Sequence, residues 1–191
     1  MPISKDEIFI SVDVETSGPN PGNFSLLAIG ACLVHDPEES FYIEVKPVNT
    51  AFTAEAIKVS QLDLEDLRQN GQTPQEAMRR FAAWVNAVTP PGYDPIFLAF
   101  NAAFDWMFVN DYFYRYLGYN PFGYKALDIK SFYMGASGVS FSKTSMKELY
   151  NKYPNIRQLS HHALQDAQDQ ARIFQILTND IKNRSTSSTH T

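Results

Sequence analysis

The first apolar run of the chain ends in two acidic residues, and this ending is the feature that most constrains the fold. The run from Ile8 to Val14 reads as a β-strand, with Asp13 and Glu15 at its carboxyl end. Side chains alternate faces along a strand, so these two carboxylates point the same way. They repel each other unless a proton or a cation lies between them. The fold must therefore supply a partner for two negative charges at the end of this strand.

A second segment of the chain contributes a third acidic residue, which follows a later strand. The continuous apolar run over 95–100 is typical of a buried strand, and helical spacing then predicts a helix over 103–117. We expect Asn101 to cap this helix, which places Asp105 in or near its first turn.

The last helix contributes a fourth acidic residue from a third segment of the chain. An apolar stripe of alanine, phenylalanine and leucine predicts a helix over 162–182, and Asp166 lies beside this stripe rather than on the solvent face. An acid on a core-facing edge is costly unless it is paired or bound to a metal. We therefore expect Asp13, Glu15, Asp105 and Asp166 to form one site, with oxygen ligands of the kind that Mg²⁺ or Mn²⁺ prefers.

Three motifs in this order resemble the DEDDh group of 3′–5′ exonucleases, which includes RNase T, oligoribonuclease and bacterial proofreading exonucleases. The motifs are Asp13-x-Glu15, Asn101-x-x-Phe104-Asp105 and His161-x-Ala163-x-x-Asp166-Ala167. The resemblance implies a ribonuclease H-like α/β fold. Its mixed five-stranded sheet has a three-stranded meander followed by alternating helices and strands, and helices flank it.

The chain departs from the family pattern at two places. Many members carry an acid at the position of Ala28 in the next strand. The stretch Pro19–Asn23 also replaces a Gly-Leu pair, whose leucine wedges between terminal bases in relatives.

The resemblance also implies a two-metal mechanism with two Mg²⁺ or Mn²⁺ ions. Asp13 would bridge both ions, Glu15 and Asp166 would complete the ion that activates water, and Asp105 would act through the second ion. His161 would be the general base. Nucleoside 5′-monophosphates would leave from the 3′ end of single-stranded RNA or DNA, or of short oligonucleotides.

Two histidines compete for the role of base. The family pattern has its histidine five positions before the last aspartate, which selects His161. A helix that began one residue differently would allow His162 to take over, so both remain open at this stage.

Each residue that could contact substrate could instead have a purely structural role. Thr16 and Ser17 could hold a terminal nucleotide or serve as an ordinary turn, and Phe100 and Phe104 could stack on a base or fill the core. Two lysines near the start of the helix expected over 144–152 could contact phosphate or could simply be solvent-exposed surface residues. Two arginines are weaker candidates for the same contact. These cations are Lys143, Lys147, Arg79 and Arg80. Asp128 could lie near the site or cap a helix or turn.

Composition favours one domain over residues 1–183, followed by a polar tail over 184–191 that we expect to be disordered. The hydrophobic fraction of 44% argues against general disorder, and Cys32 alone excludes an internal disulfide. No secretory leader or membrane-length run is visible, so cytoplasm is the expected location. The net charge of −5 disfavours a tight grip on long duplexes and suits short oligomers or single-stranded ends.

The remaining elements follow from periodicity and turn signals. Strands are expected near 7–15, 24–35, 40–46, 95–100 and 126–129, and helices near 53–70 with a break around Val59-Ser60, 74–87, 103–117, 144–152 and 162–182.

Three other functions remain as alternatives. They are a catalytically silent nucleic-acid-binding module of the same fold, an endonuclease and, less well supported, a phosphatase of the haloacid dehalogenase type. The latter expects Asp-x-Asp where this chain has Asp13-x-Glu15. A homodimer is a further candidate, with an interface from the aromatic cluster Tyr112, Phe113, Tyr114, Tyr116 and Tyr119.

Overall fold

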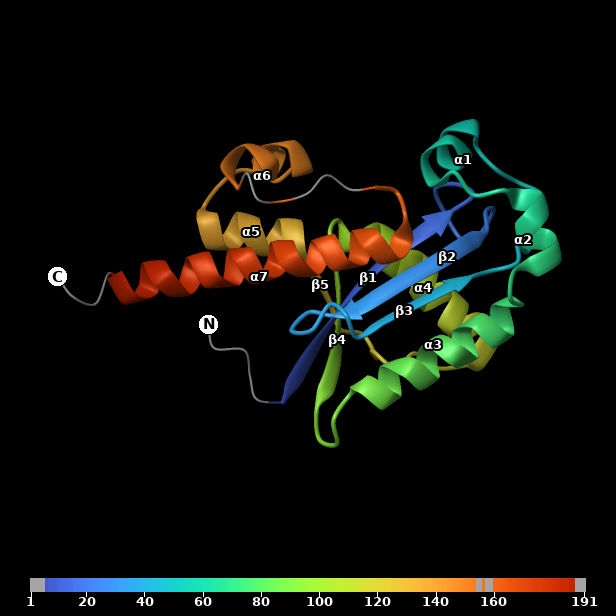
Figure 1. Cartoon of the computed structure of the whole chain (residues 1–191), viewed down its shortest axis with the longest axis horizontal. Coiled ribbons are helices and arrows are strands. Elements are labelled where there is room, and N and C mark those ends of the chain that lie inside the picture. Colours follow the sequence, from blue (N-terminus) through green and yellow to red (C-terminus); the bar gives the residue numbers. More distant parts are fainter. Residues whose placement is uncertain (1–5, 154–155, 157–159, 188–191) are drawn as a thin grey trace.

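A mixed five-stranded sheet forms the centre of the molecule, as predicted (Figure 1). The computed structural model describes residues 6–153, 156 and 160–187. The strands lie in the order β3-β2-β1-β4-β5. β1, β2 and β3 form the expected antiparallel meander, while β4 is parallel to β1 and β5 is parallel to β4. Their bounds are β1 (Glu7–Thr16), β2 (Leu26–Leu33), β3 (Ser40–Glu44), β4 (Asp94–Ala99) and β5 (Ala126–Asp128).

Helices cover both faces of the sheet. α3 and α4 pack together on one face, and α7 lies along β1 and β2 on the other with α5 beside it (Figure 1). No described helix is long and apolar enough to span a membrane. The helices are α1 (Ala54–Ser60), α2 (Leu64–Asn70), α3 (Pro74–Val88), α4 (Ala102–Leu117), α5 (Ile129–Ser137), the 3₁₀ helix η1 (Phe141–Lys143), α6 (Met146–Lys152) and α7 (Ala163–Ser187).

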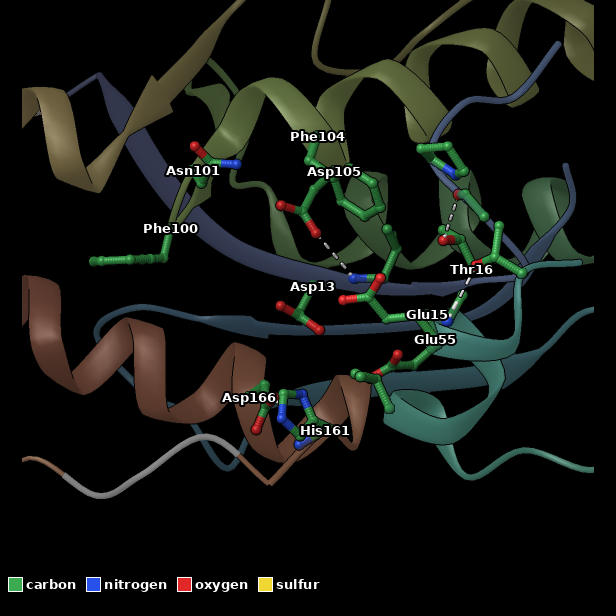
Figure 2. A pocket seen from close by; sticks show the side chains of 16 residues that line it. Asp13, Glu15, Thr16, Glu55, Phe100, Asn101, Phe104, Asp105, His161 and Asp166 are labelled. Atoms are coloured by element: carbon green, nitrogen blue, oxygen red, sulfur yellow. Dashed lines mark hydrogen bonds between the residues drawn. The ribbon is translucent and has the colours of Figure 1, made fainter. Parts of the chain in front are cut away.

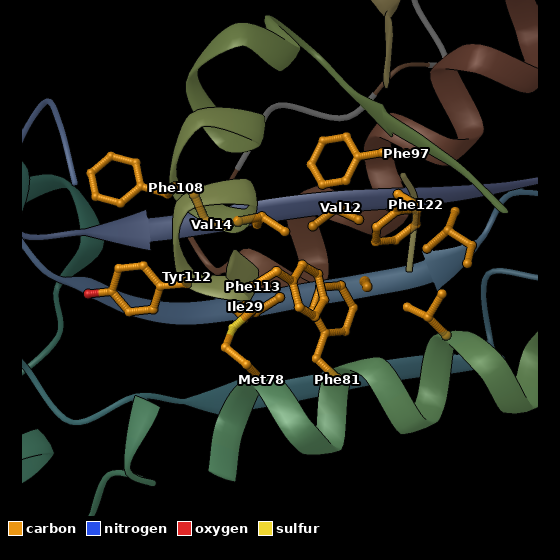
Figure 3. Packing of buried hydrophobic residues seen from close by; sticks show 14 of the residues in the cluster. Val12, Val14, Ile29, Met78, Phe81, Phe97, Phe108, Tyr112, Phe113 and Phe122 are labelled. Atoms are coloured by element: carbon orange, nitrogen blue, oxygen red, sulfur yellow. The ribbon is translucent and has the colours of Figure 1, made fainter. Parts of the chain in front are cut away.

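The alternation of side chains along β1 separates the core from the site. Ile10, Val12 and Val14 belong to the large core beneath α3 and α4 (Figure 3). The alternate side chains point to α7, where the ring of Phe9 lies 5.4 Å from that of Phe174. Asp13 and Glu15 continue this second row, so the period of the strand delivers both carboxylates to the face covered by α7.

The break expected around Val59-Ser60 is confirmed, whereas the end of the last helix differs from the expected boundary. The helical region over 53–70 is two helices, because Gln61 takes a left-handed conformation after Ser60 and Asp63 caps α2. α7 continues to Ser187, so residues 184–187 belong to a helix rather than to a tail, and 188–191 lie outside the described residues.

α5 and η1 were not predicted. The segment Ile129–Ser137 is rich in aromatic residues and contains Gly135, and these residue types have weak helix propensity. Asp128 supplies the missing start signal, because its carboxylate accepts a hydrogen bond from the Ser131 amide at 2.7 Å.

The aromatic cluster proposed as a dimer interface is mostly core. Tyr112 and Phe113 are fully buried, and the Tyr112 hydroxyl oxygen accepts a hydrogen bond from the Leu26 amide at 2.9 Å. Only Tyr114 and Tyr119 of this cluster are clearly exposed. The two buried rings therefore cannot supply a contact surface for another chain.

Gly30 sets the distance between the sheet and α7. It pairs with Asp13 across β1 and β2, and a Cβ at this position would lie 2.1 Å from the carbonyl carbon of Ala163. Only a glycine allows the first turn of α7 to approach the sheet this closely.

We expect Gly30→Ala to lower the free energy of unfolding by about 1–3 kcal/mol, because α7 must move away from β2. Gly135→Ala in α5 is the matched control, since its Cβ would meet no atom within 4 Å. It should leave stability unchanged or raise it by up to about 1 kcal/mol. Denaturant unfolding of both variants checks this, and equal stabilities would contradict the close approach.

Candidate active site

The carboxyl end of β1 opens into a cleft of about 520 Å³ that brings the predicted acids and His161 together (Figure 2). β1 contributes two acids, α4 contributes the third, and the start of α7 contributes the fourth together with the histidine. α1 and the turn after β1 form the opposite wall. The lining residues are Asp13, Val14, Glu15, Thr16, Gly18, Pro19, Thr53, Glu55, Ala56, Val59, Phe100, Asn101, Phe104, Asp105, His161 and Asp166.

Three of the acids form a compact cluster. Carboxylate oxygens of Asp13, Glu15 and Asp166 lie within 4.8 Å of one another. Glu15 and Asp166 are buried, with exposed fractions of 9% and 2%. Oxygen ligands at this spacing fit a hard divalent cation, which would also relieve their mutual repulsion.

Asp105 is held against the same strand from α4. The ladder between β1 and β4 ends at Ser11 and Leu98, so the Val14 amide lies beyond the last paired residue of β4. That amide donates to Asp105 Oδ1 at 3.1 Å (Figure 2). The early end of β4 thus leaves a backbone donor that orients the Asp105 carboxylate.

Asp166 fixes the loop that carries His161. Its Oδ1 accepts hydrogen bonds from the Ser160 amide at 2.6 Å and the Ser160 hydroxyl at 3.0 Å, and its Oδ2 accepts one from the His161 amide at 3.0 Å. His161 has a φ of 59°, which costs a non-glycine residue conformational energy. The bonds to Asp166 offset this cost and turn the imidazole into the cleft.

The two candidate histidines have different surroundings. His161 lines the cleft beside Asp166 (Figure 2). The His162 ring stacks on Tyr42 of β3 with ring centroids 4.9 Å apart, and it does not line the cleft. The geometry favours His161.

Gln170 is a site residue that the sequence analysis missed. Its amide nitrogen donates to Asp13 Oδ1 at 2.6 Å, and its amide oxygen accepts from the Phe100 backbone amide at 2.8 Å. Gln170 is 1% exposed, so these two bonds satisfy a buried amide. The signal was present, because Gln170 follows Asp166 by four residues and therefore shares its helix face.

The cleft raises the pKa of its acids. Burial raises the pKa of Glu15 to about 8, and the charges of Asp166 and Asp105 add to this effect. Burial also raises the pKa of Asp105 to about 7, against the Val14 hydrogen bond, which lowers it. The pKa of Asp13 is raised by burial and then by the charges of Asp105, Glu15 and Asp166. Protons or cations must therefore compensate these acids near neutral pH.

The structure places some of the expected substrate contacts at the cleft and others away from it. Thr16, Phe100 and Phe104 line it. Ser17 is 1% exposed, and its hydroxyl donates to the Ala51 carbonyl at 2.8 Å, so it serves the turn. Lys143 does not line the cleft and forms an ion pair with Glu148 at 3.1 Å.

The expected cap of α4 was assigned to the wrong residue. Asn101 occupies the cap position with a φ of 69°, but its side chain makes no capping hydrogen bond. Asp128 Oδ2 instead accepts from the Ala102 amide at 2.8 Å, while Oδ1 of the same carboxylate caps α5. Asp128 therefore caps both helices, and it also lies near the site, because its charge raises the pKa of Asp105.

Two comparisons with known proteins match most of the chain. Residues 10–174 match a family model described as RNase_T, exonuclease. The chain is 45% identical over 171 residues to the 3′–5′ DNA exonuclease Cap18 of Escherichia coli, covering 90% of this chain and 91% of that protein.

Two solved structures share the fold at low sequence identity. The nuclease domain of 3′hExo, a DEDDh family member bound to rAMP, has a TM-score of 0.78 at 21% identity, covering 93% of this chain and 94% of that chain. Exonuclease I of E. coli in complex with a dT13 oligonucleotide has a TM-score of 0.73 at 16% identity. That match covers 95% of this chain and 43% of that chain.

The raised pKa values predict how the metal-free protein responds to pH. Glu15 and Asp105 stay protonated to higher pH in the folded state than in the unfolded state. The folded state therefore binds more protons between about pH 4.5 and 8, and stability falls as pH rises through this window. Each proton of difference contributes about 1.4 kcal/mol per pH unit.

Thermal unfolding in chelator should therefore show a melting temperature that decreases from about pH 5 to pH 8. Glu15→Gln should flatten this decrease, because one of the titrating groups is gone. Added Mg²⁺ should raise the melting temperature more at pH 8 than at pH 5.5, since protons compete with the cation. A metal-free melting temperature that rises toward pH 8 would contradict the shifted carboxyls.

Proposed function

The chain belongs to the RNase_T exonuclease family, within the DEDDh group of 3′–5′ exonucleases, and we propose that it trims single-stranded DNA and releases nucleoside 5′-monophosphates. The convergence of four acids and His161 in one cleft is the observation that carries this proposal. The choice of DNA rests on the relative that is 45% identical, whose name describes a DNA exonuclease.

Two divalent cations, Mg²⁺ or Mn²⁺, are the proposed cofactors. Asp13, Glu15 and Asp166 would hold one ion, and Asp13 with Asp105 would hold the other. The mutual approach of the first three carboxylates supports this division, because Asp105 lies outside that cluster. When bound, the ions would activate water and stabilise charge on the departing 3′ oxygen.

The protein groups would place the strand and move the proton. His161 would accept the proton of the attacking water, because its ring faces the cleft and a neutral imidazole has a nitrogen that can accept a proton. Asp166 would act on this step through the backbone, since it holds the His161 amide. Phe104 and the apolar side chains of Ala56 and Val59 would contact the terminal nucleotide from opposite walls.

The alternatives fit the site less well. A silent binding module has no need of buried acids with raised pKa values, and the four acids of the family motifs line the cleft together with His161. A phosphatase of the haloacid dehalogenase type needs an aspartate free to attack phosphorus. Asp13 is instead bonded to Gln170 and surrounded by three further carboxylates.

We expect a stepwise ladder, shortening from the 3′ end, on 5′-labelled single-stranded DNA with Mg²⁺ or Mn²⁺ and none with chelator. Asp13→Asn should remove activity by at least about 10³-fold while the protein stays folded, because Asp13 would help to hold both proposed ions. A matched RNA strand measures the sugar preference. Circular single-stranded DNA is the control for internal cleavage and should persist. Cleavage of the circle, or a ladder on RNA alone, would overturn the proposal.

The two neighbouring histidines provide a matched test of the base. His161→Ala should lower kcat by about 10²–10⁴-fold, the usual range for loss of a general base. Stabilisation by Mg²⁺ in thermal unfolding should remain, because the acids are intact. His162→Ala should change kcat by no more than about 3-fold, since its ring stacks on Tyr42. A large loss in His162→Ala with little loss in His161→Ala would reverse the assignment.

A further inference from the structure

We propose that Phe100, which lines the catalytic cleft, forms with Lys130 and Phe141, which lie outside it, a second binding site for the upstream nucleotides of a single-stranded DNA substrate. We call these three residues the upstream site. The inference rests on the proposed function, because it assumes that the 3′ end of a strand lies at the acids.

One ammonium group lies close to two aromatic rings in the upstream site. Lys130 Nζ is 4.4 Å from the ring centroid of Phe141 and 6.0 Å from that of Phe100. The three residues come from the start of α5, from η1 and from the segment after β4. Tertiary structure alone therefore brings a cation and two rings together, in the combination that single-strand binding proteins use.

Phe141 is exposed but firmly positioned. Its exposed fraction is 53%, although it is a large apolar side chain. The backbone beneath it is fixed by Thr144, which is fully buried. The Thr144 hydroxyl donates to the Phe141 carbonyl at 2.7 Å, and the Thr144 amide donates to the same oxygen at 3.1 Å. A ring held open to solvent on a fixed turn offers a face on which a base can stack.

Charge is the second reason to place DNA here. Of the described residues that line the cleft, none is a lysine or an arginine, whereas five are acidic. A polyanionic strand therefore meets repulsion at the cleft except where cations bind, and it needs positive charge beside it. Lys130 supplies this charge, and no ion pair among the described residues involves it. Lys143, in contrast, is paired with Glu148.

The upstream site is continuous with the catalytic cleft. Phe100 lines the cleft, while its ring projects away from Asp13 and Asp105 (Figure 2). At the other end of the cleft, α1 presents Glu55, which would repel phosphate. A strand with its 3′ end at the acids is therefore expected to leave along Phe100 toward Lys130 and Phe141.

Binding of oligothymidylates of two and ten nucleotides tests this proposal. Fluorescence anisotropy with Mg²⁺ in a His161→Ala background, where turnover is slow, gives the affinity for each length. We expect the ten-nucleotide strand to bind more tightly than the dinucleotide. Lys130→Ala combined with Phe141→Ala should reduce this length advantage by about 10-fold or more, in line with the loss of one stacked base and one phosphate contact.

Single variants separate the two contributions. Lys130→Ala should lower the slope of log affinity against log salt concentration by about 0.7, whereas Phe141→Ala should leave that slope unchanged. Phe141→Trp and Lys130→Arg should restore the length advantage. Arg79→Ala on α3 and Tyr124→Ala, whose ring is 89% exposed, are the matched controls and should retain it.

The experiments distinguish an incorrect upstream site from an incorrect assignment of exonuclease activity. If the chain with His161 intact shortens DNA while the double variant keeps the full length advantage, the upstream site is wrong and the function stands. Equal losses in the control variants would also overturn the site. If the chain with His161 intact releases no nucleotide from DNA with either metal, both proposals fall.

Discussion

Repulsion among the carboxylates at the end of β1 is the constraint around which the rest of the structure is arranged. The acids come from β1, α4 and α7, so the sheet and a helix on each of its faces must be in place before the charges meet. Hydrogen-bond donors then compensate part of the charge: the Val14 amide at Asp105, the Gln170 amide at Asp13, and the loop before α7 at Asp166. A bound cation would compensate the remaining charge. The free energy of folding and the free energy of metal binding are therefore thermodynamically linked.

Most of the fold could be predicted, because the spacing of apolar residues along each segment indicates which side chains are buried. The alternation in β1 and the apolar stripe of α7 report which side chains meet the core, and both patterns were read correctly. The helix expected over 74–87 likewise matches α3, where the Thr73 hydroxyl accepts a hydrogen bond from the Glu76 amide and Pro74 is the first helical residue. Motif spacing then indicated that Asp13, Glu15, Asp105 and Asp166 converge, and the cleft contains all four.

The features that were missed depend on partners far apart in sequence. Asp128 caps α4 across 26 residues, and Gln170 bonds to Asp13 across 157 residues. The four-residue spacing from Asp166 places Gln170 on the site-facing side of its helix, but no local period identifies the distant partner in either pair. The ion pair between Lys143 and Glu148 is another contact that only the folded chain shows. α5 was not predicted because its residues have weak helix propensity. Ile129 and Tyr133 are buried in the same core cluster as apolar residues of α7, and this packing outweighs the weak propensity.

One amide group, that of Gln170, joins the Asp13 carboxylate to the backbone that carries Phe100. Its donor and its acceptor lie on one rigid plane, so a displacement at either end is transmitted to the other. Events at the two ends are then thermodynamically linked, and linkage is reciprocal. A DNA strand that orders Phe100 would raise the affinity for the cation by a certain factor. The bound cation would raise the affinity for the strand by the same factor. The concentration of metal at which such a protein becomes loaded is then set jointly with its substrate.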